Sequence, residues 1–170
     1  PWRCPECGST EVRSGIVGAT TTAAELGRAF PDVPVVDSSG AHVRDSVDSD
    51  PRLVVATPGA EPAPESGYAC AVILDAVSSL SRPGLAAVEQ TVDRWMAILA
   101  LVRSVRDGGR AVVVGPSEDA ALQAMVRNDP AGWAARELTD RREARFPPAV
   151  PCGIVDGDPK AVASAAQRLG

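Results

Sequence analysis

Short apolar runs alternate along the chain with longer stretches in which apolar residues recur at helical spacing. The near-continuous runs are residues 52–57, 69–75 and 111–115. Runs of this kind are typical of strands that are covered on both faces, as in a parallel sheet. Residues 33–36 form a shorter strand candidate, in which Pro34 favours a strand start or an edge. Residues 11–17 form a further candidate strand.

Two helices are predicted in the first two thirds of the chain. The first is capped within residues 20–22 and ends before Pro31. The second runs from near Pro83 to the glycine pair after Asp107 and carries one apolar stripe. The stripe consists of Leu85, Val88, Val92, Trp95, Met96, Leu99 and Val102. A stripe with Trp and Met is compatible with a cofactor contact, but a buried helix face is the preferred interpretation.

Two more helices are predicted downstream. Ser117 opens the third, since acidic residues follow it in the first turn, where they suit the helix dipole. Asp129 caps the fourth, with proline at the first helical position. This helix ends in a basic cluster of Arg141, Arg142 and Arg145. Cationic side chains stabilise a last helical turn, and the alternative is a contact with phosphate or a neighbouring domain.

The order of elements predicts an α/β fold with a doubly wound, mostly parallel sheet. Ligands of such sheets bind outside the carboxyl ends of the strands, so Thr57 and Asp75 mark the expected site. For Asp75, capping of the following turn is an equally open interpretation. The loop after Thr57 carries Glu61 and Glu65 and is followed by no basic residue before Arg82. A loop that holds nucleotide phosphates or a DNA backbone would be expected to carry positive charge.

Composition narrows the range of functions. The chain has 170 residues, with 17 basic and 22 acidic side chains and a net charge of −5, which disfavours a free-standing basic nucleic-acid binder. One domain with a core is expected at this length. The sequence has no apolar run long enough to span a membrane and opens with no signal segment.

The initial Pro1 predicts that the chain is part of a longer protein. After a boundary at residues 147–151, a strand over 153–157 and a helix over 159–169 predict the start of a second domain.

Two residue types are nearly absent. Lys160 is the only lysine and His42 the only histidine. A phosphate-binding loop with a lysine beside its glycines is therefore excluded from the first 159 residues. A serine or cysteine nucleophile paired with histidine would have to use His42, which lies in a polar stretch expected to be an exposed loop.

The four cysteines fall into two kinds. Cys4 and Cys7 stand two residues apart before Gly8, the spacing of a zinc knuckle. They supply two of four ligands, so the remaining ligands are expected upstream or on a partner. A redox pair and inert thiols are weaker alternatives. Cys70 and Cys152 are expected to be small buried residues.

Several motifs in this order resemble one family. A Cys-Pro-x-Cys-Gly-Ser knuckle precedes a helix that ends in Phe-Pro, strands end in Thr and in Leu-Asp, and a basic helix closes on Pro-Pro. The chain is thereby similar to the second helicase lobe of the primosomal replication-restart helicases, the primosomal protein N′ (PriA) family. The matching positions are Cys4 to Ser9, Gly18, Leu26, Phe30-Pro31, Ala56-Thr57, Leu74-Asp75, Glu89, Gly109, and Asp140-Arg141-Arg142 through Pro147-Pro148.

The resemblance implies three parts: the second half of a zinc-binding module over residues 1–10, a RecA-like lobe over 11–148, and the start of a C-terminal domain over 149–170. In the family eight cysteines hold two zinc ions, and Cys4 and Cys7 correspond to the last pair. The family's activity is ATP-driven unwinding at stalled forks and loading of the replicative helicase. The implied partners are forked or single-stranded DNA and proteins of the primosome and replisome, in the cytoplasm and away from membranes.

The chain departs from the family where nucleotide chemistry is expected. The family's Gly-Thr-Gln-Met and Lys-Gly-His segment is replaced at residues 56–62, which contain neither lysine nor histidine. Leu101 and Ser104 stand where the family places arginines that stabilise the transferring phosphoryl group. Arg103 or Arg106 would substitute only if the helix rotated, because adjacent helical positions face about 100° apart.

Loss of such an arginine costs ~10³–10⁵ in rate. We therefore predict a lobe that keeps the fold but has lost ATP turnover, as in degenerate forms similar to the actinobacterial members, and assign it no catalytic or nucleotide-binding residue. The favoured hypothesis is a non-hydrolysing scaffold in a replication-restart protein. The alternative is an active ATP-dependent 3′–5′ DNA helicase with divergent motifs. An unrelated zinc-bound α/β enzyme has little support.

Overall fold

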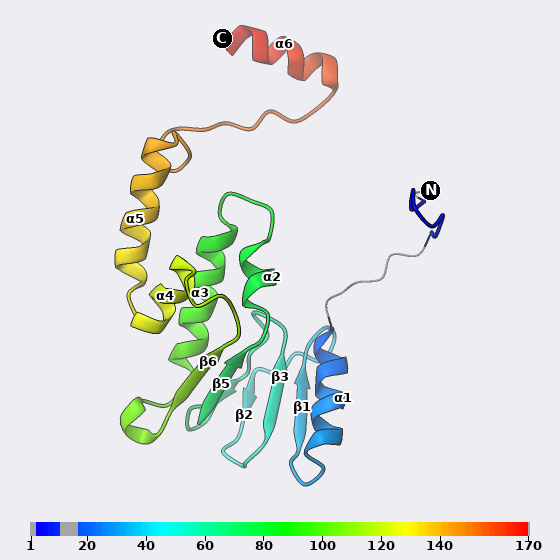
Figure 1. The fold of residues 1–170 in the computed structure, drawn as a ribbon, viewed down its shortest axis with the longest axis vertical. Helices are drawn as coiled ribbons and strands as arrows, with labels where there is room; N and C mark the ends of the chain where they lie inside the picture. Colours follow the sequence, from blue (N-terminus) through cyan, green and yellow to red (C-terminus); the bar gives the residue numbers. More distant parts are fainter. Residues whose placement is uncertain (1–2, 11–16, 170) are drawn as a thin grey trace. The chain divides into compact units, whose positions relative to one another are not determined.

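The computed structural model describes residues 3–10 and 17–169. These residues form two compact units, each built from two stretches of chain. The first unit comprises Pro1–Ile73 and Ala97–Val112, and the second comprises Leu74–Met96 and Val113–Gly170. Figure 1 shows the order of helices and strands along the chain.

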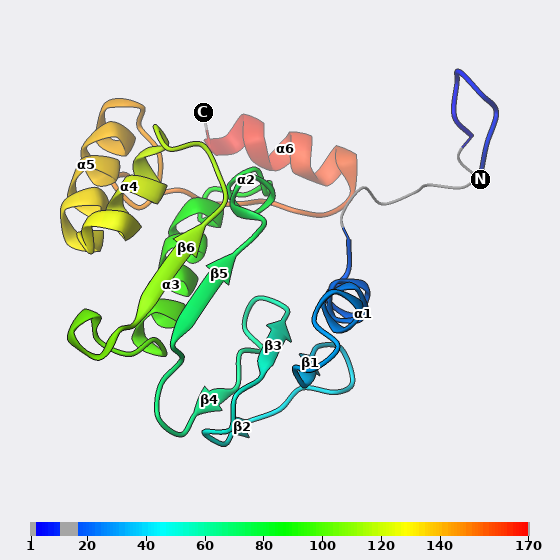
Figure 2. The ribbon, with the colours of Figure 1, turned by 60° about the horizontal axis from the view of Figure 1, so that its bottom comes forward.

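The first unit contains short strand pairs and one helix at its N-terminal side. Its elements are α1 (Ala19–Ala29), β1 (Val35–Ser38), β2 (Ser46–Val47), β3 (Leu53–Ala56), β4 (Ala63–Pro64), β5 (Cys70–Ile73), the 3-10 helix η1 (Val105–Asp107) and most of β6 (Arg110–Val113). β1 pairs with β3 in parallel, and β2 pairs with β4 in parallel. α1 packs on β1 and β3, as Figure 2 shows. Both strands of the first pair therefore end beside the start of the same helix.

The second unit is mainly helical. It contains α2 (Ala76–Leu80), most of α3 (Ala87–Ala100), α4 (Ala120–Arg127), α5 (Pro130–Glu143) and α6 (Pro159–Leu169). Its buried apolar side chains are Ala76, Ala87, Val92, Trp95, Ala121, Leu122, Ala124, Met125 and Trp133. They come from α2 to α5, so the core of this unit is an interface among helices.

The expected strands are confirmed as β1, β3, β5 and β6, but the expected sheet is wrong. A RecA-like, doubly wound, mostly parallel sheet requires several strands paired side by side. The described residues instead form three separate two-stranded sheets, ordered β1-β3, β2-β4 and β5-β6, with strands of two to four residues. The fold is therefore an α/β arrangement of short strand pairs and helices.

The exposure of the strand residues explains why the apolar runs wrongly predicted strands that are covered on both faces. Val72 in β5 is 55% exposed and Val112 in β6 is 48% exposed. Alternate residues of β5 are exposed, so helices do not cover this strand on both faces. A continuous apolar run does not distinguish a strand with two covered faces from a strand with one.

Helix ends differ from prediction by small shifts. Asp129 caps α5 as expected, because its Oδ1 accepts from Gly132 N at 2.8 Å. α4 is capped by Asp119 instead of Ser117. α1 starts after Gly18, one residue before the expected threonines, and has no side-chain cap.

The long helix is shorter than expected. α3 ends at Ala100, and the residues up to Asp107 form a turn and η1 instead of continuing it. Within the predicted stripe, Val92 and Trp95 are buried, which supports the core interpretation for the middle of the helix. Leu85 precedes α3 and is exposed.

Some elements were not predicted, and some predictions lie outside the structure. α2, β2 and β4 had no sequence signal. Residues 153–157 form no strand, whereas α6 confirms the helix expected after them. The strand predicted over residues 11–17 lies outside the described residues, apart from Val17. Across the ranges given above, no helix is both long and apolar enough to cross a membrane.

Candidate functional site

The cysteine pair forms a closed turn. Gly8 N donates to Cys4 O at 2.9 Å, and Cys4 N donates to Ser9 O at 2.9 Å. Gly8 has φ +68°, in the left-handed region that favours glycine. Hydrogen bonds from the backbone N–H groups of Cys7 and Glu6, and from the Cys7 thiol, lower the pKa of the Cys4 thiol.

This turn fits half of a thiolate metal site. Backbone N–H groups that point at sulfur stabilise the thiolate, which is the form that binds metal. Cys7 is exposed and Cys4 is partly exposed, so both sulfurs are accessible. No group of three or more metal-binding side chains exists in the part of the chain that the structure describes. Cys4 and Cys7 would therefore hold a zinc ion only together with ligands from elsewhere.

A second polar centre lies at the carboxyl end of β1. Ser38 is fully buried, with 0% exposure. Its Oγ donates to Ala60 O at 2.7 Å and accepts from Arg44 N at 3.0 Å. Ser38 thus ties the loop after β1 to the loop after β3. Ser38 was not predicted as a functional residue, although it lies at the carboxyl end of a strand, the same kind of position that singled out Thr57.

Asp37, next to Ser38, links β1 to α1. Its carboxylate accepts from Thr20 Oγ1 at 2.8 Å and from Ser39 Oγ at 2.6 Å. These two hydrogen bonds, the Ser39 bond first, lower the pKa of Asp37, and His42 adds to the effect. The hydroxyl groups of Thr20 and Ser39, near the start of α1, therefore donate to Asp37 of the same unit.

The loop after Thr57 is folded onto itself. Ala60 N donates to Thr57 O at 2.9 Å, and Gly59 N donates to both carboxylate oxygens of Glu61, at 3.0 and 2.8 Å. A phosphate-binding loop presents free backbone N–H groups to its ligand. Here an acidic side chain of the same loop takes that place, which agrees with the charge argument from the sequence.

The residues near the family's arginine positions also have structural roles. Arg103 Nε donates to Ser66 O at 3.1 Å and to Gly67 O at 2.9 Å. Ser104 caps η1, with its Oγ 2.6 Å from Asp107 Oδ2. Arg103 therefore clamps the turn before β5 through its Nε–H.

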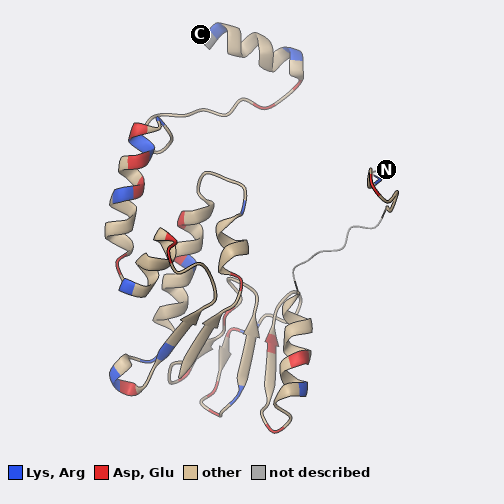
Figure 3. Ribbon diagram, in the orientation of Figure 1, with Lys and Arg blue, Asp and Glu red and all other residues tan. Residues whose placement is uncertain are grey.

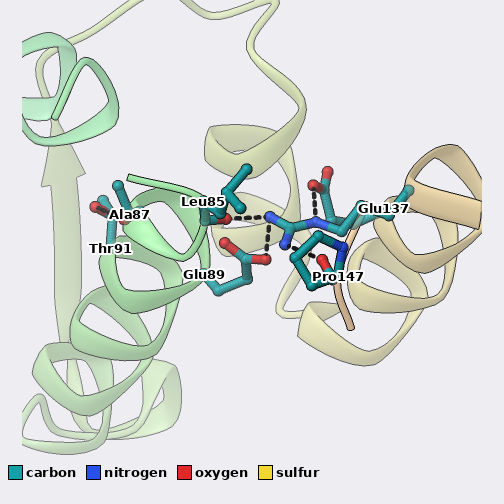
Figure 4. Close-up of polar contacts among 7 residues, drawn as sticks. Leu85, Ala87, Glu89, Thr91, Glu137 and Pro147 are labelled. Carbon is teal, nitrogen blue, oxygen red and sulfur yellow. Dashed lines mark hydrogen bonds and ion pairs between the residues drawn. The ribbon is translucent and has the colours of Figure 1, made fainter. Parts of the chain in front are cut away.

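The three arginines of the basic cluster at the end of α5 lie in different environments. Arg141 is turned inward and its guanidinium contacts Glu137, Glu89 and two backbone carbonyls, as Figure 4 shows. Arg142 and Arg145 are exposed. Figure 3 shows that charges of both signs alternate along α5. The helix therefore presents no purely basic face.

The remaining predicted residues are on the surface. His42 is exposed, as expected. Asp75 occupies the N-cap position of α2, but its side chain makes no capping hydrogen bond. The prediction that Cys70 and Cys152 are buried is wrong, because both are exposed. Cys70 lies on an uncovered position of β5, and Cys152 follows α5 in an irregular segment.

Comparison with known proteins gives relatives from mycobacteria. The chain is 46% identical over 160 residues, 94% of its length, to the "Probable replication restart protein PriA" of Mycobacterium leprae (strain TN). It is also 46% identical over 155 residues to the proteins of the same name from Mycobacterium tuberculosis (strain CDC 1551 / Oshkosh) and Mycobacterium bovis (strain ATCC BAA-935 / AF2122/97). No protein-family model matches the chain.

The chain spans about a quarter of these relatives' own length, 25% and 24% for the first two. The matched region nevertheless covers almost all of the chain, including most of both compact units. The resemblance to the PriA family that the sequence motifs predicted is thereby confirmed.

Proposed function

We propose that this chain, which is similar to replication restart protein PriA over almost its whole length, forms part of a replication-restart protein. The observation that carries the proposal is 46% identity across 94% of the chain. Forked or single-stranded DNA and proteins of the primosome and replisome are then its partners, through the full-length protein. Its place of action is the cytoplasm, where the chromosome is replicated.

We further propose that this region is a scaffold without ATP turnover. Three features support this role. Gly59 N–H is bonded to Glu61, Arg103 Nε clamps the turn at residues 66–67, and Ser104 caps η1. Groups that already hold the fold together do not reach a nucleotide unless those contacts break. Acidic side chains in the loop after β3 also repel phosphate.

The restart role is tested by DNA binding of the full-length protein. Fluorescence anisotropy with forked and with blunt duplex DNA of equal length compares the two affinities. The proposal expects tighter binding to the fork, with the same affinity in the presence and absence of ATP. Equal affinity for both DNAs would contradict a role at forks. Fork binding that requires ATP would contradict the scaffold while leaving the restart role intact.

Zinc is the cofactor that we propose for the cysteine turn. The support is the pair of accessible sulfurs and the N–H groups directed at Cys4, which stabilise a thiolate. A zinc ion there takes its other two ligands from outside residues 3–10. The ion would lock the turn to the segment that supplies those ligands, which is the usual role of a four-ligand structural site.

Metal analysis of the full-length protein tests this assignment. Cys4→Ser removes one thiolate, so the zinc content should fall by about one ion per molecule. Cys70→Ser is the matched control, because this cysteine is also exposed but lies in β5. Unchanged zinc content in Cys4→Ser would reject the site.

A further inference from the structure

Arg141 joins segments that are far apart in the sequence. Its Nε donates to Glu137 Oε1 at 2.8 Å, and Nη1 donates to Pro147 O at 2.8 Å. Nη2 contacts Leu85 O and Glu89 Oε1. Figure 4 shows these four acceptors around the guanidinium. One side chain thus connects α5 with the loop before α3, with α3 itself and with the chain that follows α5.

The backbone at the end of α5 brings these groups together. Phe146 N donates to Arg141 O at 2.8 Å, and Arg145 N donates to Arg142 O at 3.3 Å. These bonds form a Schellman motif, in which the residue at the turning point adopts a left-handed conformation. Arg145 occupies that point with φ +58°. The reversal carries Pro147 back to the guanidinium of Arg141.

The exit turn, residues 145–150, has few other anchors. None of its residues is fully buried, and Phe146 is 51% exposed. Its other backbone bond, from Val150 N to Phe146 O, lies within the turn itself. The side chain of Arg141, by contrast, is only 12% exposed. The polar contacts of Arg141 therefore hold a turn that apolar packing holds only weakly.

The α3 loop, residues 81–86, contacts the same guanidinium. Its residues are all exposed, and Leu85 O is the carbonyl that Arg141 contacts. On the other side of α3, Thr91 Oγ1 donates to Ser79 O at 3.1 Å and to Ala87 O at 2.8 Å. Figure 4 places Thr91 and Ala87 away from the guanidinium. α3 is thus fixed to α2 without Arg141. The α3 loop is bonded to α2 and α3 only near its two ends, through Ser81 N to Val77 O and Ala87 N to Gly84 O, and Arg141 is the residue that joins it to α5.

The charges at this centre are unequal. Two carboxylates, of Glu89 and Glu137, face one guanidinium. Glu89 Oε2 is buried and has no hydrogen-bond partner within the described ranges. The two carboxylates raise the pKa of Arg141, with the Glu137 hydrogen bond as the largest cause. Loss of the guanidinium would leave two facing carboxylates without a counter-charge and two carbonyls without a donor.

We propose that Arg141 is a strap that fastens the exit turn and the α3 loop to the end of α5. The strap fixes the path of the chain between the end of α5 and residue 150. When it is broken, the two segments open locally while the core around Trp95 and Trp133 stays packed. This proposal does not depend on the replication-restart role, because it rests only on contacts within one compact unit.

Hydrogen–deuterium exchange of the full-length protein tests the strap. Arg141→Met keeps an unbranched, apolar side chain of the size of the arginine's aliphatic part and removes all five donors. We expect exchange in peptides that cover residues 81–87 and 145–150 to rise about tenfold or more, since hydrogen bonds to charged groups are lost. Peptides that cover α4 should change by less than about twofold. Arg142→Met is the matched control, because its side chain is the exposed neighbour on the same helix.

Two results would overturn the proposal. The first is unchanged exchange of both segments in Arg141→Met. The second is an equal increase across α3, α4 and the exit turn, which would make Arg141 a general stabiliser of the unit. Glu89→Gln is a milder variant that keeps an acceptor and removes one charge. It should loosen the α3 loop more than the exit turn, and equal exchange in both segments would also count against the strap.

Discussion

Ser38 at the end of β1 and Arg141 at the end of α5 both hold a loop that follows a regular element, and they do so with different chemistry. Ser38 is fully buried, uncharged and bonded to two backbone groups. Arg141 is charged, partly exposed and bonded to two carboxylates and two carbonyls. A hydroxyl avoids burial of a charge where two loops lie close together. A guanidinium reaches several acceptors where the segments lie further apart.

The comparison bears on function because both kinds of group are also used to bind phosphate. Near β1 and β3, the hydroxyls and the Gly59 N–H are bonded within the first unit. In the second unit, the least exposed arginine of the basic cluster is bonded to acidic side chains. In both regions, groups of the kinds that bind phosphate are instead bonded to other groups of the same unit.

Removal of the Ser38 hydroxyl should have the largest effect on stability. In Ser38→Ala, Ala60 O loses its donor and Arg44 N–H loses its acceptor, and an unpaired buried polar group costs about 1–3 kcal/mol. We expect the free energy of unfolding to fall by about 2–3 kcal/mol, measured by pulse proteolysis of the full-length protein in urea. Ser46→Ala, at an exposed position of β2, is the control. A change below about 0.5 kcal/mol would mean that Ser38 does not hold these loops.

Release of backbone strain at Arg145 should have a smaller effect, with the opposite sign. A non-glycine residue in the left-handed region costs roughly 1–2 kcal/mol, part of which glycine's greater unfolded-state freedom offsets. Arg145→Gly should therefore stabilise the second unit by about 0.5–1 kcal/mol in the same assay. Arg145→Ala keeps the strain and should be close to neutral. If the alanine variant were stabilised as much as the glycine variant, backbone strain would not be the cause.

The smallest expected effect is a difference in how the stability contributions of Asp37 and Arg141 change at low pH. Asp37 has a lowered pKa because Ser39 and Thr20 donate to its carboxylate. Its contribution to stability is thus present above the unfolded-state pKa of about 3.9 and is lost as the pH falls through the lower folded-state value. Arg141 has a raised pKa, so its contribution is lost only at strongly alkaline pH.

Asp37→Asn tests this difference. The stability gap between wild type and variant should be constant from neutral pH down to about pH 5 and close below about pH 4. Unfolding of the full-length protein at several pH values measures the gap. A gap that stays constant down to about pH 2 would show that the carboxylate charge is not what stabilises the end of β1.

The sequence predicted the individual elements better than their assembly. The Asp129-Pro130 pair located the start of α5, and apolar runs located β1, β3, β5 and β6, because these signals are local. Pairing of strands depends on contacts between distant residues, which an apolar run does not encode. The doubly wound sheet was therefore wrong, as was the burial of Cys70.

In the candidate sites, too, features set by neighbouring residues were predicted and features set by distant residues were not. The cysteine turn was expected from the cysteine spacing and the following glycine, and Gly8 N donates to Cys4 O there, whereas the zinc site itself stays a prediction. Ser38 and the inward position of Arg141 were not predicted, since nothing in the local sequence separates them from Ser39 or Arg142. Their roles follow from partners that lie 22 and 56 residues away in the chain.

The proposal with the widest consequence for function is that this region is a scaffold without ATP turnover. The most direct test is steady-state ATP hydrolysis by the full-length protein with and without forked DNA. We expect no increase in rate on addition of DNA, and the same rate for wild type and Arg103→Ala. DNA-stimulated hydrolysis that Arg103→Ala abolishes would contradict it, because Arg103 would then act on the nucleotide and not only on the turn at residues 66–67.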